Sequence, residues 1–370
     1  MIQRENLVTQ GLYKSYIDNL KDILFKGFVV SPRGKEIREL LSSRLSGKAD
    51  EENLISINDV RDVSNPSRVE GRYLITELFW YFSGSNRAEF ISNYGSLWGR
   101  ITNDDGTLNS NYGRNVFYDN VPGQTKTKFN WARDTLCKDP DTRQAIIPYT
   151  SDVIFTDRCA GDFTCTQLQH FFIRENKLHS IVYIRSSDSV FGLNFDIPFW
   201  SIAQQIMLMM LKEWETEKFK DLEMGNIEIL IGSSHIYSTH YELCHNMLRY
   251  ANDHHSECCK SLRVDPSAIE RFDSDHPIFK IIEEFIEDTQ NEFRLDYGVG
   301  GLVEIAQWLR HEDDLEADYG TLKNVLCFSA KTMMKIYRYA YYSNGGKMPG
   351  TKDYWFNWVK KWFDAFFKIV

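Results

Sequence analysis

A cysteine and an arginine stand at the two ends of a pair of alternating apolar segments. Cys165 opens "CTQLQHFFIR" and Arg185 closes "KLHSIVYIR", with only "EN" between the segments. Two strands joined by so tight a turn run antiparallel, which brings the start of the first beside the end of the second. A guanidinium beside a thiol favours the nucleophilic thiolate. The same pattern also fits a small buried cysteine, so the pair alone leaves both interpretations open.

Glu77 is the only charged residue within the apolar segment "YLITELFWYF". A carboxylate on such a helix lies either at the solvated edge or in a polar pocket. A pocketed carboxylate has a raised pKa and suits proton transfer. The local pattern favours the solvated edge.

Asp196 and the segment "GSSHIYSTH" each admit two interpretations. Asp196 directly precedes "IPFWSIAQQIML", where an aspartate would cap the N-terminus of a helix. Ser234, His235 and Tyr237 form a cluster of donors and acceptors at a strand end, where they would bind a sugar or satisfy a turn.

The elements that must position these residues follow from hydrophobic spacing and turn residues. In chain order we expect a helix over 6–26, a strand, a Pro-Gly turn and a returning segment over 28–40, a helix over 72–82 ending at Gly84, a helix over 85–95 with Ser85 as its N-cap, the hairpin described above, a helix after Asp196, and a strand leading into a helix over 226–248. From about residue 276 the chain is mainly helical, with segments at 277–288, 301–310 and 321–342.

The segment "YWFNWVKKWFDAFFKIV" places seven apolar residues on one helical face. They are Trp355, Trp358, Val359, Trp362, Phe363, Phe366 and Phe367. We expect a helix docked on the body of the protein. A membrane-surface or partner-binding helix is the alternative, but such a helix usually carries more lysine and arginine on its polar face.

Composition narrows the classes of function. The 370 residues include 43 Lys+Arg and 52 Asp+Glu, a net charge of −9, which argues against a general nucleic-acid binder. The N-terminus lacks an apolar signal core and no run approaches a membrane span, so we expect a cytoplasmic protein without membrane contact. Seven scattered cysteines indicate reduced thiols. The cluster "HHSECC" (254–259) matches no common zinc spacing, and we expect no metal.

Several separated segments, in this order, resemble the thymidylate synthase superfamily. They are "TELFWYFSGSN", "SLWGRITNDDGTLNSNYGR", "DPDTRQAII", "CTQLQHFFIRENKLHSIVYIRSSDSVFGLNFD" and "GSSHIYSTH". The resemblance spans about residues 20–245. It implies an α+β fold with a mixed sheet and surrounding helices, here over residues 1–275, and a helical C-terminal extension of unknown role over 276–370.

The resemblance also implies roles for individual residues. Cys165 would attack C6 of a pyrimidine nucleotide, and Glu77 would organise proton transfers and water near the ring. The implied nucleotide ligands are Arg33, Arg143, Arg185 and Ser186 for phosphate, His235 and Tyr237 for the sugar, and Tyr112 and Asp196. Trp98 and Asp188 would contact the folate, with Glu77 beside it.

The expected phosphate site departs from the family pattern at one position. Arg143 resembles an arginine that the family donates across a homodimer interface to its neighbour's phosphate. A second arginine usually follows it, but this chain has Gln144. The expected phosphate site therefore has one positive charge fewer.

Asp196 stands where the thymidylate enzymes have asparagine. An asparagine amide donates to O4 of uracil and accepts from N3–H, whereas cytosine presents a 4-amino donor and an unprotonated N3. A carboxylate accepts from the 4-amino group, and from N3–H once N3 is protonated, while it opposes O4 of uracil with a second acceptor. Thr166 follows the cysteine where thymidylate synthases usually have histidine. The deoxycytidylate hydroxymethylases of bacteriophages share both features.

The resemblance thus predicts a homodimeric one-carbon transferase that hydroxymethylates dCMP with 5,10-methylenetetrahydrofolate and water. Alternatives within the superfamily are dCMP 5-methylation, CMP 5-hydroxymethylation and thymidylate synthesis. A non-enzymatic member that binds a nucleotide or RNA is a further alternative, which the net charge and the presence of Cys165 and Glu77 oppose.

Overall fold

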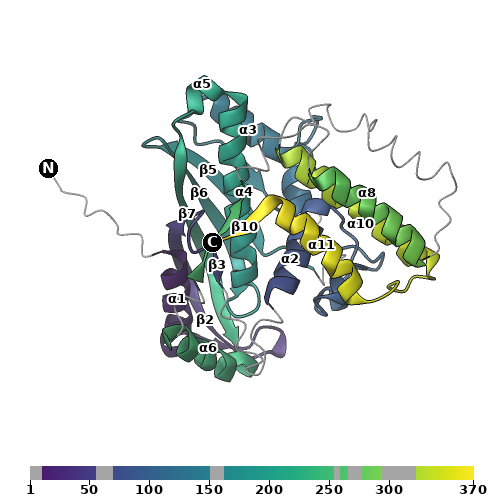
Figure 1. Cartoon of the computed structure of the whole chain (residues 1–370). Coiled ribbons are helices and arrows are strands. Elements are labelled where there is room, and N and C mark those ends of the chain that lie inside the picture. The colour runs from purple at the N-terminus through teal and green to yellow at the C-terminus, as the bar shows by residue number, and fades with distance from the viewer. Residues whose placement is uncertain (1–10, 56–69, 151–161, 254–258, 266–276, 294–321) are drawn as a thin grey trace.

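The computed structural model describes residues 11–55, 70–150, 162–253, 259–265, 277–293 and 322–370. Two parts are visible in Figure 1: a sheet with its covering helices on the left, and a group of C-terminal helices on the right. In the part of the chain that is described, no helix has the length and apolarity needed to cross a bilayer.

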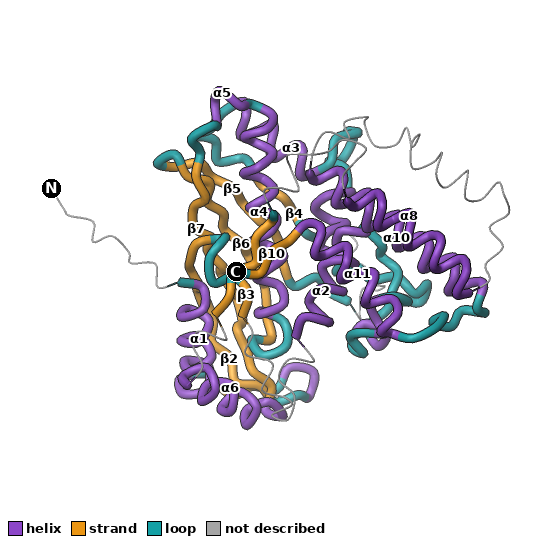
Figure 2. Tube along the Cα trace, in the orientation of Figure 1, coloured by secondary structure: helices purple, strands orange, loops and turns teal. Residues whose placement is uncertain are grey.

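A six-stranded mixed sheet is the centre of the first part (Figure 2). Its strands, in spatial order, are β1 (Phe28–Val30), β2 (Ile37–Lys48), β7 (Glu223–Tyr237), β6 (Lys177–Asp188), β5 (Thr166–Arg174) and β4 (Ile146–Pro148). Strands β6 and β7 pair in parallel, and the other neighbours pair antiparallel. The predicted hairpin of β5 and β6 is confirmed, and its two turn residues, Glu175 and Asn176, have φ values of 52° and 56°.

Helices cover this sheet and supply the core. They are α1 (Leu12–Lys26), α3 (Lys128–Lys138), α4 (Leu193–Trp214), α5 (Thr216–Phe219) and α6 (Tyr241–Asp253). Helix α4 packs on β6 and β7, and Gln204 on α4 accepts a hydrogen bond from Ser180 on β6 at 2.6 Å. Because buried polar groups need partners, this bond fixes how α4 sits on the sheet. The predicted strand-to-helix transition of β7 and α6 is confirmed.

Two of the C-terminal helices, α10 (Leu322–Ser343) and α11 (Lys352–Phe366), pack against α2 (Glu70–Ser83), the helix that carries Glu77. The third, α8 (Pro277–Phe293), packs on α10 and α11. The Trp362 ring lies 5.3 Å from the Phe79 ring and 5.9 Å from the Phe82 ring of α2. All seven apolar residues of the last helical face are buried, so the predicted docked helix is confirmed.

Four short strands complete the fold. Strand β10 (Phe367–Ile369) pairs antiparallel with β9 (Leu262–Val264), and β3 (Leu54–Ile55) pairs with β8 (Cys259–Lys260). Figure 1 shows β10 crossing from the C-terminal helices back to α4. The end of the described chain is therefore tied to the sheet domain by backbone hydrogen bonds.

The helix predicted over 85–95 is wrong. The structure has a 3₁₀ turn at Ile91–Asn93 and another at Trp98–Arg100. The Asn93 side chain takes the carbonyl of Glu89 at 2.6 Å, which an α-helix would pair with a backbone N–H. The Ser85 hydroxyl accepts from the Arg87 N–H at 3.4 Å, but no α-helix directly follows it. The helix expected over 301–310 and the start of the helix expected over 6–26 lie outside the described residues.

Trp362→Ala should lower the free energy of unfolding by about 3–5 kcal/mol, because a fully buried indole would be replaced by a cavity. Denaturant unfolding measures the change. Phe25→Ala, at a side chain that is 72% exposed, is the control and should cost less than about 1 kcal/mol. Equal losses in the two variants would show that α11 is not packed as described.

Candidate active site

Cys165 and Arg185 meet at the entrance of the hairpin, as the sequence predicts. Arg185 Nη2 lies 3.5 Å from Cys165 Sγ. Its Nε and Nη2 also donate to the carbonyls of Thr164 at 3.0 Å and Phe163 at 2.6 Å, and the guanidinium stacks on the Phe163 ring. Arg185 is thus held against the loop that carries the thiol, while its side chain remains exposed.

Charges from several elements converge on the thiol. Burial raises the pKa of Cys165, and Arg185 opposes the shift most strongly. Asp196 and Asp162 add to the increase, whereas Arg33 lowers the pKa. The two arginines therefore offset part of the increase that burial causes, although the net shift still raises the pKa of this thiol.

Glu77 lies at the end of a short chain of hydrogen bonds. Trp98 Nε1 donates to the Tyr73 hydroxyl at 2.9 Å, and that hydroxyl donates to Glu77 Oε1 at 2.6 Å. Glu77 is only 3% exposed, so the expected solvated edge is wrong. The helix turns this carboxylate inward because its opposite face packs on α10 and α11.

Burial raises the pKa of Glu77 to about 7, and the hydroxyls of Tyr73 and, to a smaller extent, Tyr81 act in the opposite direction. Its second oxygen, Oε2, is buried, and no group among the described residues, the nearby Tyr81 hydroxyl included, meets it in good hydrogen-bond geometry. An unpaired buried carboxyl oxygen is costly, so this atom is placed to bind a water or a ligand group. A carboxyl that titrates near neutrality can both give and take a proton.

Asp196 lies in the first turn of α4 and does not cap it. The N-cap is Gly192, whose carbonyl accepts from the Asp196 N–H at 3.1 Å. The capping interpretation is therefore wrong, and the side chain is left for the site. Burial raises the pKa of Asp196 well above its usual range, and Glu77 adds to the increase. The carboxyl is thus kept protonated more readily than an ordinary aspartate.

Aromatic rings border Asp196. Its charge raises the pKa of the Tyr81, Tyr112 and Tyr149 hydroxyls, in each case after the larger effect of burial. Tyr112, which the sequence predicts for the site, stacks on Tyr81 at 5.5 Å and accepts from the Thr166 N–H at 3.4 Å. The nucleophile loop, α2 and α4 therefore share one aromatic wall.

Ser186, His235 and Tyr237 lie together on β6 and β7. Ser186 Oγ is 3.5 Å from His235 Nδ1, and the His235 and Tyr237 rings are 5.3 Å apart. Burial raises the pKa of Tyr237, and smaller effects come from Asp188, Arg33 and Cys165. The structure thus brings the predicted sugar and phosphate ligands to the strand ends beside the thiol.

Asp188 and the two remaining arginines are placed differently. Asp188 Oδ1 accepts from the backbone N–H groups of Val190 at 2.9 Å and Phe191 at 3.2 Å, so it holds the turn that leads into α4. Arg33 is exposed at φ 54° in the turn after β1. Arg143 is also exposed, and within the described ranges no contact joins its side chain to the other predicted ligands.

Three further residues contribute to the site and are absent from the sequence prediction. Tyr73 binds Glu77 and stands four residues before it on a helix, a spacing that could have revealed the pair. Asp162 accepts from the backbone N–H groups of Asn109 and Ser110, which anchors the loop before Cys165. Asn194 is 3% exposed, and its Oδ1 has no partner in the described structure; no local pattern marks it.

No cluster of three or more His, Cys, Asp or Glu side chains in the described ranges could hold a metal ion. Most of "HHSECC" lies outside those ranges. The unpaired buried atoms of the site are instead oxygens and an indole nitrogen: Glu77 Oε2, Thr166 Oγ1, Asn194 Oδ1 and Trp80 Nε1. Such groups suit an organic ligand.

Residues 14–282 match the family model for thymidylate synthase, so this chain belongs to the thymidylate synthase family. It is similar to the deoxycytidylate 5-hydroxymethyltransferase of Enterobacteria phage T4, with 26% identity over 242 residues that cover 63% of this chain and 88% of that protein. The enzyme of the same name from Enterobacteria phage T6 is 27% identical over 240 residues, covering 62% and 87%.

The fold agrees with this family. The thermostable thymidylate synthase A from Bacillus subtilis matches with a TM-score of 0.50 at 18% identity, over 65% of this chain and 84% of that one. The predicted α+β fold with a mixed sheet and additional C-terminal helices is confirmed. The family match ends inside α8, and the division at residue 275 stays a prediction.

Family and relatives together identify a one-carbon transferase. The family acts on a pyrimidine nucleoside monophosphate with methylenetetrahydrofolate. The residues present fit such a folate: the partly exposed Trp98 indole adjoins Glu77 through Tyr73. In addition, no hydrogen bond to Asp188 Oδ2 is found within the described ranges.

Glu77 should make stability depend on pH. Its pKa in the folded chain, about 7, exceeds its ordinary value of 4.5, so the folded state binds the proton more tightly than the unfolded state. The free energy of unfolding should therefore fall as pH rises through this interval, whereas Glu77→Gln should lack this loss. The free energy of unfolding of the variant, relative to that of wild type, should therefore increase by up to ~3 kcal/mol across this pH interval.

Denaturant unfolding between pH 4.5 and pH 7.5 measures this difference. The exposed Glu217→Gln on α5 is the control and should differ from wild type by a constant amount. A constant difference for Glu77→Gln as well would contradict the buried, protonated carboxyl.

Proposed function

We propose that this protein 5-hydroxymethylates dCMP with 5,10-methylenetetrahydrofolate and water, giving 5-hydroxymethyl-dCMP and tetrahydrofolate. The observation that carries the proposal is Asp196, an aspartate that does not cap its helix, whose pKa burial and Glu77 raise, and whose charge raises the pKa of Cys165. The likeness to phage deoxycytidylate 5-hydroxymethyltransferases supports it.

Asp196 would select cytosine by pairing with the hydrogen-bonding groups on the edge of that base. A protonated carboxyl donates to N3 of cytosine and accepts from the 4-amino group with its other oxygen. The proton shared with N3 makes C6 more electrophilic. Uracil offers N3–H and O4 instead, so one donor meets a donor and one acceptor meets an acceptor.

Cys165 supplies the covalent step. Its thiolate, favoured by Arg185 and Arg33, forms a bond to C6, and C5 gains the electron density to form a carbon–carbon bond. Methylenetetrahydrofolate, when bound, supplies one carbon at the oxidation level of formaldehyde. C5 would then lose its proton as the bond from the transferred carbon to the folate nitrogen breaks, which releases tetrahydrofolate and leaves an exocyclic methylene on C5. Hydroxide from water would add to that methylene, and the sulfur–C6 bond would break to restore the ring and the thiolate.

Glu77 would bind the water molecule and accept its proton when the water adds to the exocyclic carbon. Its unpaired Oε2 would hold the water, and a pKa of about 7 lets it accept the water's proton at neutral pH. Tyr73 holds the other oxygen and thereby fixes the orientation of the carboxyl group. Trp98 and Asp188 would hold the folate beside it.

Residues at the ends of the strands would bind the phosphate and the sugar of the nucleotide. Arg185, Arg33 and Ser186 would bind the phosphate beside the thiol. Arg143, exposed on the chain that leads into β4, would reach the phosphate of a second copy in a homodimer. His235 and Tyr237 would bind the sugar hydroxyl, and Tyr112 would border the base.

The product of the reaction tests the function. Incubating the protein with methylenetetrahydrofolate and dCMP, CMP or dUMP, followed by mass measurement, should give a gain of CH₂O on dCMP. A gain of CH₂ would instead indicate methylation, and no change on any nucleotide would indicate a binding protein. Cys165→Ser should abolish turnover while nucleotide binding stays measurable, and activity in that variant would exclude the covalent step.

Asp196→Asn should move preference from dCMP toward dUMP, because an amide matches the uracil edge. The ratio of kcat/KM values for the two nucleotides should shift by ~10²–10⁴-fold. Asp188→Asn, an equal change in charge at the end of β6, should leave that ratio unchanged. Full dCMP preference in Asp196→Asn would remove the base-reading role.

A further inference from the structure

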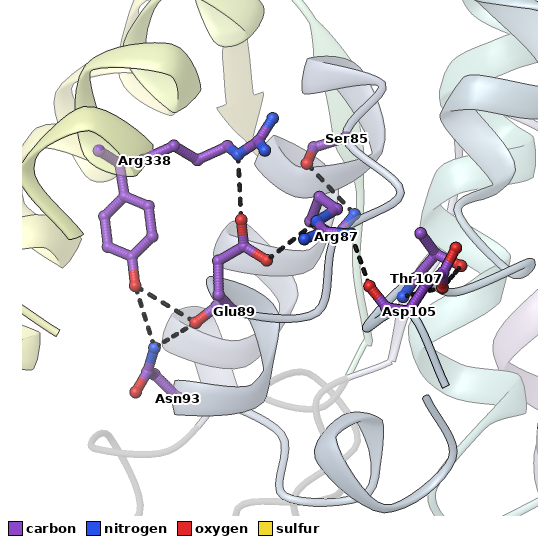
Figure 3. Close-up of polar contacts among 8 residues, drawn as sticks. Ser85, Arg87, Glu89, Asn93, Asp105, Thr107 and Arg338 are labelled. Atoms are coloured by element: carbon purple, nitrogen blue, oxygen red, sulfur yellow. Dashed lines mark hydrogen bonds and ion pairs between the residues drawn. The ribbon is translucent and has the colours of Figure 1, made fainter. Parts of the chain in front are cut away.

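Glu89 lies between two guanidinium groups, one of which belongs to α10 of the C-terminal extension (Figure 3). Arg338 on α10 donates from Nε to Glu89 Oε1 at 3.0 Å, and Arg87 Nε is 3.8 Å from Oε2. The Glu89 side chain is only 10% exposed. A charge so little hydrated persists in a fold only where its partners compensate for the lost water.

Helix α10 also holds the backbone of the same residue. The Glu89 carbonyl accepts from the Tyr337 hydroxyl at 3.2 Å and from Asn93 Nδ2 at 2.6 Å. Asn93 Nδ2 is in turn 3.2 Å from the Tyr337 hydroxyl. Two neighbouring residues of α10 therefore fix both the carboxylate and the carbonyl of Glu89.

A continuous run of backbone hydrogen bonds leads from this point to Trp98. Ser92 donates to the carbonyl of Ala88 at 3.0 Å, Gly95 to that of Ile91 at 2.9 Å, and Trp98 to that of Gly95 at 3.1 Å. A segment bonded in this way moves as one unit, so a shift at Glu89 reaches the indole.

Gly95 couples this segment to the acid helix. A Cβ placed there would lie 2.6 Å from the Tyr73 ring and 3.0 Å from the Trp98 ring. Both rings thus pack on the bare backbone of Gly95, and Trp98 Nε1 completes the contact by donating to Tyr73. Any slip of the segment would break the chain from Trp98 through Tyr73 to Glu77.

We propose that Glu89 is a positioning residue, and that its ion pair with Arg338 lets the C-terminal extension set the place of Trp98 in the folate subsite. The proposal rests on the proposed function in its choice of ligand. Apolar contacts, such as that between the Phe90 and Tyr337 rings 5.1 Å apart, hold the extension against residues 88–98 but do not fix one position along that segment. The charged hydrogen bond is directional and fixes the register.

Glu89→Gln tests the proposal, since it keeps the shape of the side chain and removes its charge. It should raise KM for methylenetetrahydrofolate about tenfold while KM for dCMP stays within about twofold. Arg338→Ala should raise the same KM. Arg338→Lys should raise it much less, because Arg338 makes a single contact with Oε1 that a lysine can replace. A purely structural role would raise both KM values alike.

Glu284→Gln is the matched control, because Glu284 also lies between two cations of the extension, Lys280 at 3.8 Å and Lys361 at 3.7 Å, but is 46% exposed. It should change neither KM. Amide hydrogen exchange gives a readout without turnover: residues 88–101 should exchange faster in Glu89→Gln than in wild type, with β5 and β6 unchanged.

Unchanged exchange over residues 88–101, or an equal rise in both KM values, would overturn the positioning role. A wild-type protein that modifies no nucleotide would overturn the proposed function instead. Faster exchange confined to 88–101 would support the positioning role whatever the wild-type reaction is.

Discussion

The site depends on two carboxyl groups brought together where water is scarce. Glu77 and Asp196 come from different helices, and within the described ranges neither forms an ion pair. Burial therefore raises the pKa of both carboxyl groups, to about 7 for Glu77, and Glu77 raises the pKa of Asp196 further. That arrangement gives α2 a group that exchanges protons near pH 7 and gives α4 an acid that holds its proton more firmly than an ordinary aspartate. Asp196 also links this pair to the thiol, because its charge raises the pKa of Cys165.

Keeping those groups buried requires a firm support behind α2. The sheet supports α4 and the hairpin, but the face of α2 that points away from Glu77 rests on α10 and α11, with the Trp362 ring of α11 against Phe79 and Phe82. The helices that lie beyond most of the family match thus hold α2 in place, while the burial that raises the pKa of Glu77 lies on the other face of that helix.

Much of the fold could be predicted from the sequence because strong local signals agreed with the final packing. The hairpin was marked by alternating apolar residues and a tight turn, and it placed Cys165 beside Arg185 correctly. Glu77 was misplaced because a helical pattern shows which face is apolar, not that two apolar faces would both be covered. The segment over 85–95 failed because a side-chain amide, Asn93, took a carbonyl that helix propensity assigns to the backbone. Glu89 left no local signal, since its partner stands almost 250 residues away.

The pairing of β9 with β10 changes what kind of appendage the C-terminal helices are. About one hundred residues leave the sheet domain after Val264 and return to it at Phe367, where the two strands are bonded side by side. Such a segment behaves as an excursion closed at its base and not as a free tail. Closure limits how far the helices can separate from α2 and brings them back quickly if they do. The entropic cost of closing the loop rises by only about 0.6 kcal/mol for each doubling of loop length. The excursion can therefore lengthen or shorten while its helices stay packed on α2.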